Sequence, residues 1–236
     1  MCVRYTLHQT DAALAAIARA LGRHLDPPDW VQPKFNVAPT HIVPGVTLQA
    51  GSPEVRGFFW GFVPFYERDK PQPRMLTNAQ SEKAAASPAF RDAIARRRCL
   101  IPVNGFYEWE TRGKLKLPHL FTLKEEEPFA FAGIWEPGPD PSLPPGFTIL
   151  TTTPNEIVGR YHDRMPVMLA GEAMPRWLGG DGPLPADEYQ ALTSPLAPER
   201  MQERPVNRFV NNARNEGPQC LAPPEEAPPE LELPLG

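Results

Sequence analysis

Apolar residues recur along this chain at two periods, and each period predicts one kind of element. Within residues 10–21 they fall at the spacing of one helix face. Thr10 is a plausible N-cap and Gly22 a stop signal, so the pattern predicts a helix over 10–21. Two shorter helices are predicted at 88–97, after Ser87 as cap, and at 186–192.

Short runs of β-branched and aromatic residues predict strands. They cover 55–63, 99–103, 119–123, 129–135, 147–153 and 206–210, and a further strand, 105–110, follows a turn at Asn104-Gly105. The segment FNVAPT at 35–40 is short and polar, which favours a loop with a specific role. Many short strands and few short helices predict an α+β fold with a curved, barrel-like antiparallel β-sheet core and short peripheral helices.

Length and composition favour one domain followed by a tail. The chain has 236 residues, of which 41% are hydrophobic, enough for a sizeable core over residues 1–222. Residues 223–236 are rich in proline and glutamate, so they cannot bury enough apolar surface to offset their ordering entropy, and a disordered acidic tail is predicted. The net charge is −4, and four glutamates of the tail account for it, so the body is near neutral and overall charge decides nothing about nucleic acid.

Cysteine usage and the lack of a long apolar run point to a reducing compartment. No stretch has the length of a membrane span and no signal peptide is evident, so we expect a cytoplasmic protein without membrane contact, most simply a monomer. The three cysteines lie far apart and form no C-x-x-C pair. We therefore expect reduced thiols, no structural zinc, and no metal or other cofactor.

Cys2 is the main candidate for a reactive residue, because of its place next to Met1. Because its side chain is small, we expect Met1 to be removed, which leaves an amine and a thiol on adjacent carbons. Such a 1,2-aminothiol condenses with an aldehyde, first as a Schiff base and then as a thiazolidine. The alternative is an ordinary residue at a frayed terminus or a small core hydrophobe.

Four other polar residues lie in segments whose remaining residues are predicted to be buried: Asn78, Glu108, His162 and Arg164. Glu108 lies between two aromatic residues on an apolar strand. Either it is half exposed on an edge strand, or it is buried, where desolvation raises its pKa and lets it act as general acid or base. His162 is equally open to a structural reading, and a Cys–His pair by itself would indicate a thiol protease.

Six ordered segments together resemble the SOS response-associated peptidase family, whose members process abasic sites in single-stranded DNA. The segments are MCVRY (1–5), FNVAPT (35–40), WGFVP (60–64), NAQSE (78–82), CLIPVNGFYEW (99–109) and HDRMPVML (162–169). A weaker match, VNNARNEGPQCLAP, extends the resemblance to about residue 223. The likeness therefore covers nearly the whole chain outside the acidic tail.

The resemblance implies roles for matching residues. Cys2 resembles the residue that cross-links to the sugar aldehyde. Glu108 resembles the acid used in ring opening, in Schiff-base proton transfer and in release of the leading peptide. His162 resembles the partner of the sugar oxygen, and Asn78 the amide that positions the lesion and the N-terminus. Arg164 resembles an arginine on the DNA backbone, and Arg4 another basic residue of the site.

Two departures from the family pattern bear on DNA binding. Val3 stands where the family usually has glycine, and Gln80 stands where the asparagine motif usually continues with arginine. Losing one phosphate-contacting cation is expected to lower affinity and flatten the salt dependence. Arg74 or one of the arginines 96–98 is a possible substitute, although a triplet at a helix end is more often solvated.

Two tryptophans are candidates for contact with unpaired bases, and two other functions are open. Trp60 and Trp109 are candidates for stacking on unpaired bases, with core packing as the equal alternative, and alternation puts Trp109 on the face opposite Glu108. The expected partner is single-stranded DNA with abasic sites. A thiol peptidase using Cys2 and His162, or a non-enzymatic single-strand binder, stays open as an alternative.

Overall fold

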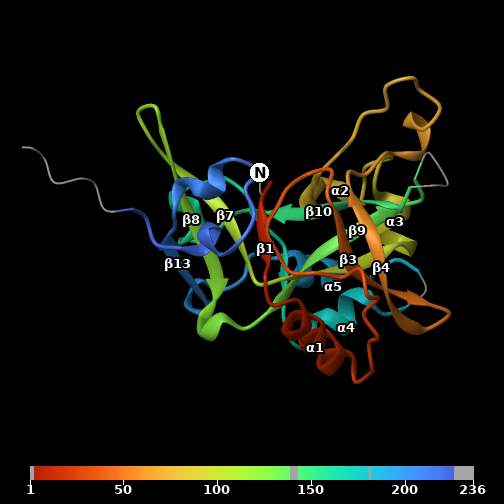
Figure 1. The fold of residues 1–236 in the computed structure, drawn as a ribbon. Helices are drawn as coiled ribbons and strands as arrows, with labels where there is room; N and C mark the ends of the chain where they lie inside the picture. Colours follow the sequence, from red (N-terminus) through yellow and green to blue (C-terminus); the bar gives the residue numbers. More distant parts are fainter. Residues whose placement is uncertain (1–2, 139–142, 181, 226–236) are drawn as a thin grey trace, which may run out of the picture.

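The computed structural model describes residues 3–138, 143–180 and 182–225, and its strands form two sheets. The first sheet has the order β13-β8-β7-β1-β2, where β1 is Tyr5–Leu7 and its two neighbours are β7 (Gly105–Arg112) and β2 (Lys34–Val37). Its other side is built from β8 (Leu115–Leu123) and β13 (Met201–Pro205). Every pairing in this sheet is antiparallel, and in the view of Figure 1 β1 has β7 and β8 on one side and β3 and β9 of the second sheet on the other.

The second sheet closes on itself and confirms the barrel-like core. Its ring consists of β3 (Ile42–Gln49), β4 (Ser52–Trp60), β6 (Arg98–Val103), β9 (Phe129–Glu136) and β10 (Gly146–Thr152), and it closes because β10 pairs with both β4 and β9. The short strands β5 (Asn78–Gln80), β11 (Met165–Pro166) and β12 (Met168–Leu169) extend it. The pairings of β10 with β4 and β5 are parallel, so the sheet is mixed rather than wholly antiparallel.

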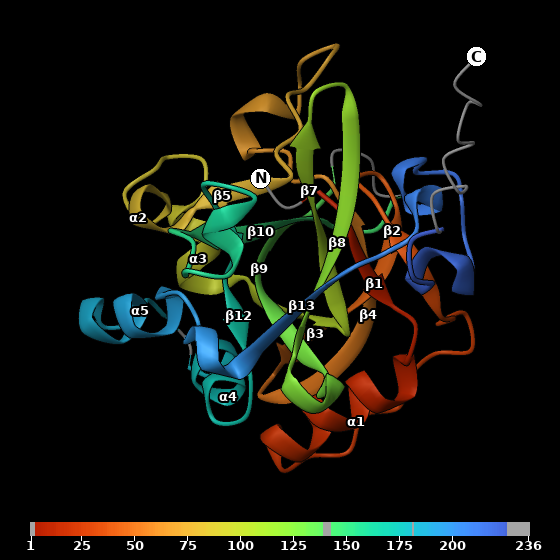
Figure 2. The ribbon, with the colours of Figure 1, turned by 90° about the vertical axis from the view of Figure 1, so that its left-hand side faces the viewer.

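Short helices cover the outside, with α1 and α4 close together at one end of the barrel (Figure 2). The helices are α1 (Thr10–Leu21), α2 (Ser81–Ala84), α3 (Arg91–Arg96), α4 (Ala173–Leu178) and α5 (Ala186–Thr193). The 3-10 turns are η1 (Phe65–Glu67), η2 (Lys124–Glu126), η3 (Val158–Arg160), η4 (Pro198–Arg200), η5 (Arg208–Asn211) and η6 (Pro218–Leu221). No helix in the described ranges is long and apolar enough to cross a membrane.

The predicted helix over 10–21 is confirmed, with a different N-cap residue. Gln9 is the N-cap residue, and the Thr10 hydroxyl donates to the Leu7 carbonyl instead of capping the helix. Gly22 ends the helix in the left-handed conformation, at φ 58°. The helix predicted at 88–97 is shorter, and residues 88–90 precede α3 as a turn.

Two segments differ from the expectation because distant partners decide them. Residues 34–37 form β2 and not a loop, since Phe35 and Val37 extend beside β1 while Asn36 is fully buried. The Asn36 amide donates to the carbonyls of Asn212 and Asn215, more than 170 residues away in sequence. The strand predicted at 206–210 is wrong: the strand is β13, and the 3-10 turn η5 follows it.

The Asn104-Gly105 turn transfers the chain between the sheets. Strand β6 before it pairs with β9 in the barrel, whereas β7 after it pairs with β8 and β1. Gly105 is needed there because a Cβ would lie 2.8 Å from the Phe121 carbonyl oxygen. The turn therefore brings the polar strand β7 directly beside the aromatic core of the barrel.

The arginine triplet is not a solvated helix end. Arg98 is 6% exposed and donates to six backbone carbonyls, those of Ile94, Ala95, Trp177, Gly179, Gly180 and Gly182. Arg97 bonds to Asp92 and Glu136. Only Arg96 of the three keeps an exposed side chain, which pairs with Asp92, so the expectation fails for Arg97 and Arg98.

Candidate active site

Glu108 lies on the core-facing side of β7. Alternation places Phe106 and Glu108 on one face, against the barrel, and Tyr107 and Trp109 on the other. Glu108 is 4% exposed, and within the described part of the chain its Oε1 has no hydrogen-bond partner. Burial raises the pKa of Glu108 to about 7, and the nearby Asp163 carboxylate acts in the same direction. Of the two readings of the sequence, the buried one is correct.

The segment 161–164 approaches Glu108 through the neighbouring strand. His119 on β8 is paired with Glu108 in register, and its ring centroid lies 4.5 Å from that of Tyr161. Tyr161 also packs edge-on against Phe121. His162 and Asp163 follow directly, so strand pairing and ring packing place them next to the buried acid.

His162 is held as a neutral imidazole at neutral pH. Burial lowers its pKa, outweighing the Asp163 carboxylate, whose own side chain is 87% exposed and screened by water. The Arg164 backbone N–H donates to Nδ1 over 2.9 Å, and the Asp163 carboxylate lies 2.9 Å from the same nitrogen. The two residues that follow His162 therefore hold its Nδ1 in place.

A second set of polar groups lines the adjoining edge of the barrel. Strand β5 runs parallel to β10, which pairs Asn78 with Ile149 and Gln80 with Thr151. The Asn78 amide nitrogen donates to the Thr77 hydroxyl, while its buried Oδ1 has no partner among the described residues. Arg164 donates to the Thr151 carbonyl, so this edge and the 161–164 segment form one continuous surface.

Arg164 forms a two-point ion pair with a residue that was not predicted from the sequence. Its two terminal nitrogens donate to the two carboxylate oxygens of Glu82 at 3.0 and 2.7 Å. Glu82 is the last residue of the NAQSE segment, so the motif carried a signal for it. Tyr161 and Asp163 were likewise missed, and their positions directly before and after His162 were the available hint.

The start of the described chain runs beside Glu108. Tyr5 pairs with Phe106, and the Tyr107 N–H donates to the Arg4 carbonyl over 3.0 Å. Continuing this antiparallel register by one residue brings Val3 to the level of Glu108. Cys2 itself lies outside the described residues.

Arg4 and the two tryptophans lie apart from this surface. The Arg4 guanidinium donates to Asn36 and the Val210 carbonyl and lies over the Trp109 ring at 5.6 Å, on the face opposite Glu108. The opposite-face expectation for Trp109 is confirmed. Trp60 is fully buried in the core and its indole N–H donates to the Thr77 carbonyl, so it supports the strand of Asn78 and offers no surface to a base.

Gln80 and Arg74 are exposed, and neither makes a described side-chain ion pair. The other two cysteines, Cys99 and Cys220, are buried free thiols, and burial raises the pKa of both. Within the described ranges no group of three or more His, Cys, Asp or Glu is placed to hold a metal ion.

Comparison with known proteins places this arrangement in a family. The profile of the family described as SOS response associated peptidase (SRAP) matches residues 1–213. The chain belongs to the SRAP family. It is 33% identical over 192 residues to the abasic site processing protein YoqW of Bacillus subtilis. The aligned region covers 80% of this chain and 85% of that relative.

SRAP relatives occur in distant organisms. The abasic site processing protein HMCES of Gallus gallus is 30% identical over 84% of this chain and 70% of its own length. The protein YedK of Escherichia coli is 27% identical over 94% of this chain and all of its own. A crystal structure of a Bacteroides thetaiotaomicron protein superposes with a TM-score of 0.77 at 25% identity, covering 94% of this chain and 99% of that one.

Proposed function

We propose that this SRAP protein captures abasic sites in single-stranded DNA as a covalent thiazolidine through Cys2, after loss of Met1. The observation that carries the proposal is the buried Glu108, with a pKa of about 7, an oxygen without a described partner, and β1 with Arg4 running beside its strand. The relatives named abasic site processing proteins support the substrate, and the family description supports an associated peptidase activity.

The reaction joins one sugar to one residue with loss of one water. An abasic deoxyribose is mainly a closed hemiacetal, so its ring must open to expose the aldehyde. The neutral α-amine of Cys2 then adds to the aldehyde carbon, and loss of water gives an imine. The thiol sulfur adds to the imine carbon and its proton passes to the nitrogen, which closes the thiazolidine.

Glu108 is proposed as the group that moves these protons. With a pKa near 7, both its protonated and its ionised form are populated at neutral pH, which suits general acid and general base steps. As acid it protonates the departing oxygen in ring opening and in imine formation. As base it removes the proton from the ammonium of Cys2. The same carboxyl is the proposed acid in release of a leading peptide from the N-terminus.

His162 and Asn78 are proposed to position the sugar. Burial lowers the pKa of His162, so a neutral imidazole is proposed to contact a sugar oxygen. The unpartnered Asn78 Oδ1 can accept from a sugar hydroxyl or from the α-amine. Arg164, on the same surface, is the proposed DNA-backbone contact, with Gln80 beside it and Arg4 as a more remote basic contact.

The test compares cross-linking by wild type with cross-linking by a variant that keeps the amine and lacks the thiol. The trimmed protein is incubated with single-stranded DNA carrying one abasic site, and the heat-stable adduct is measured on a denaturing gel. Cys2→Ser keeps the amine, so it is expected to give an adduct only when borohydride reduces the imine. Cys220→Ser is the matched control and should behave as wild type. A heat-stable adduct from Cys2→Ser at the wild-type rate would overturn the proposal.

The same preparation separates the two other functions. A thiol peptidase acting on other proteins would hydrolyse peptide substrates without DNA, and alkylation of the thiol would stop it. A non-enzymatic binder would retain undamaged single strand tightly and give no adduct with the abasic strand.

A further inference from the structure

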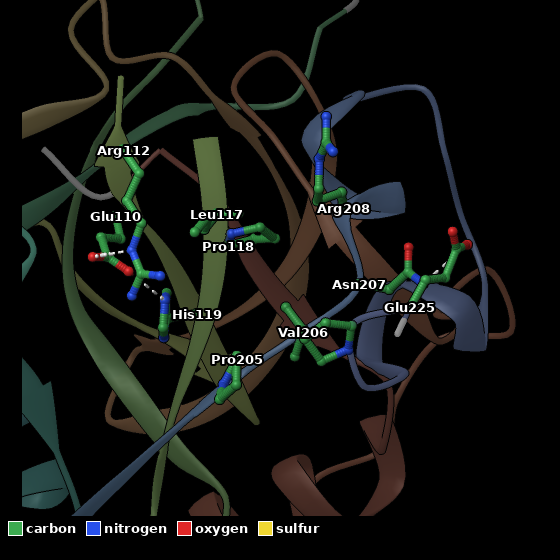
Figure 3. Close-up of a pocket in the computed structure, with 11 residues that line it drawn as sticks. Glu110, Arg112, Leu117, Pro118, His119, Pro205, Val206, Asn207, Arg208 and Glu225 are labelled. Atoms are coloured by element: carbon green, nitrogen blue, oxygen red, sulfur yellow. Dashed lines mark hydrogen bonds and ion pairs between the residues drawn. The ribbon is translucent and has the colours of Figure 1, made fainter. Parts of the chain in front are cut away.

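A groove of 570 Å³ opens beside the candidate active site, between the β7–β8 hairpin and the segment that follows β13. Its floor is apolar and consists of Leu117, Pro118, Pro205 and Val206. Two exposed arginines, Arg112 and Arg208, stand on opposite sides of it (Figure 3). The groove thus offers an apolar strip between two cations.

The groove shares a wall with the site. Glu110 and His119 line it, and Glu110 lies two residues beyond Glu108 on the same face of β7, while His119 is paired with Glu108 in register. A ligand in the groove therefore lies next to the buried acid and beside any DNA strand that reaches it.

Both arginines have hydrogen-bonding capacity left for a ligand. Arg112 uses its Nε to bond Glu110, and its terminal nitrogens make no bond to another described residue. Arg208 forms no ion pair within the described part of the chain. Carboxylates are the natural ligands for such guanidinium groups.

The chain itself leads into this groove at its C-terminal end. The Asn207 backbone N–H donates to the Ala222 carbonyl over 2.7 Å, which anchors the segment there. Pro224 and Glu225 then line the groove, and the Asn207 amide nitrogen lies 3.5 Å from the Glu225 carboxylate (Figure 3). Glu225, the last described residue, therefore lies in the groove.

The sequence that follows has the chemistry that the groove offers. Residues 226–236 read EAPPELELPLG, with three glutamates for the two arginines and prolines and leucines for the apolar floor. Eleven residues in an extended, proline-rich conformation reach roughly 34 Å at about 3.1 Å each. This length is enough to cross the groove and pass Arg112.

We infer that residues 223–236 dock in this groove as an intramolecular ligand and compete with single-stranded DNA for the approach to Glu108. The docking does not depend on the proposed function, whereas the competition with DNA rests on it. The acidic tail then occupies the groove in place of single-stranded DNA, and the DNA has to displace the tail before cross-linking. Binding of the lesion-containing strand is thereby weakened without any change in the catalytic groups.

Docking is tested without DNA by limited digestion with a glutamate-specific protease, because all cleavage sites of the tail are glutamates. Mass spectrometry follows release of the tail from the full chain. The double variant Arg112→Ser/Arg208→Ser is expected to lose its tail about fivefold faster than wild type, the size that two exposed ion pairs supply. The control Arg23→Ser/Arg200→Ser removes two exposed arginines outside the groove and should match wild type.

Cleavage at glutamates of the folded body, read in the same digest, must stay constant, which excludes general unfolding as the cause. Equal tail release in all three proteins overturns the inference. Tail release from wild type that slows as protein concentration rises also overturns it, because the ligand would then be the tail of a second copy.

Competition is tested with the full chain in which Glu225, Glu226, Glu230 and Glu232 are changed to glutamine. The control changes four exposed glutamates elsewhere, Glu125, Glu127, Glu172 and Glu199. At low salt the tail variant is expected to bind undamaged single strand about fivefold more tightly than the control. Equal affinity of the two variants overturns the competition. If neither protein forms an adduct with abasic DNA, the proposed function fails, yet the digestion result still decides the docking.

Discussion

Glu108 and Arg98 are two buried ionisable side chains in adjacent sheets, 4% and 6% exposed. They differ in how completely their polar atoms are hydrogen-bonded. Arg98 at the start of β6 directs its guanidinium at six backbone carbonyls. Glu108 in β7 keeps one oxygen without a described partner, and burial raises its pKa to about 7. Only one turn of chain, at Asn104-Gly105, separates the strands that carry them.

The difference distinguishes a buried charge that stabilises the fold from a buried group that is available for a reaction. A buried charge whose hydrogen bonds are all made fixes the loops around it and leaves no capacity for a ligand. A buried carboxyl with an open lone pair costs stability, and proteins retain such groups mainly where a substrate completes the bonding. We therefore expect Arg98 to control folding and Glu108 to control reaction rate.

Arg98→Met should produce the largest effect, on stability. Removing the guanidinium leaves several carbonyls of the 179–182 loop and of α3 without a donor, which is expected to cost about 3–5 kcal/mol of unfolding free energy. Urea unfolding measures it. The rate of cross-linking per folded molecule should stay within about twofold of wild type, and a large fall in that rate would remove the distinction between the two residues.

Glu108→Gln should act on the rate instead. Glutamine keeps the size but cannot transfer a proton, so cross-linking is expected to slow about 100-fold, the usual range for a general acid or base. DNA affinity should be nearly unchanged in a binding titration. Glu110→Gln, two residues along the same face, is the matched control and should alter the rate less than about threefold. An equal loss in both variants would mark a general electrostatic effect.

The pKa of Glu108 also predicts how stability depends on pH. The folded protein holds this proton more tightly than the unfolded chain, with a pKa of about 7 against 4.5. The resulting stability is fully present below pH 4.5 and is lost as pH rises to about 7, by about 3 kcal/mol. Relative to Glu108→Gln, wild type should therefore lose stability between about pH 5 and pH 8 in urea unfolding. An unchanged difference would show that the carboxyl is hydrated.

Gln80→Arg is expected to give the smallest change, on DNA binding. Gln80 is exposed on β5 beside the Arg164 surface, so an arginine there should reach a backbone phosphate. The plot of log affinity against log salt should steepen by about 0.7, the value for one phosphate contact with a single strand. Gln49→Arg, an exposed position at the end of β3, serves as control, and an equal slope change there would mean that position does not matter.

Local patterns predicted much of the fold. The helix at 10–21 and the strands of the barrel follow from apolar periodicity and turn residues, which act over a few positions. The strand at 34–37 did not follow, because its buried Asn36 is satisfied by carbonyls at 212 and 215. Likewise, the triplet at 96–98 gives no local sign that Arg98 meets the 179–182 loop.

The site was predictable in its residue types and not in its arrangement. Composition left the burial of Glu108 undecided, and only the pairing of β7 with β1 and β8 shows that its face meets the core. The grip of Glu82 on Arg164 spans 82 residues of sequence, which no local pattern encodes. Roles for Cys2, Asn78, Glu108 and His162 stay predictions of the reaction proposed above.

The most direct test of the proposed reaction is to identify the residue that carries the sugar. The adduct with a short abasic oligonucleotide is digested with nuclease and protease, and the modified peptide is sequenced by mass spectrometry. The account predicts a peptide that begins at Cys2, lacks Met1, and carries the sugar remnant with loss of one water. A remnant on a lysine or on Cys99 or Cys220, or an adduct that retains Met1, would contradict it.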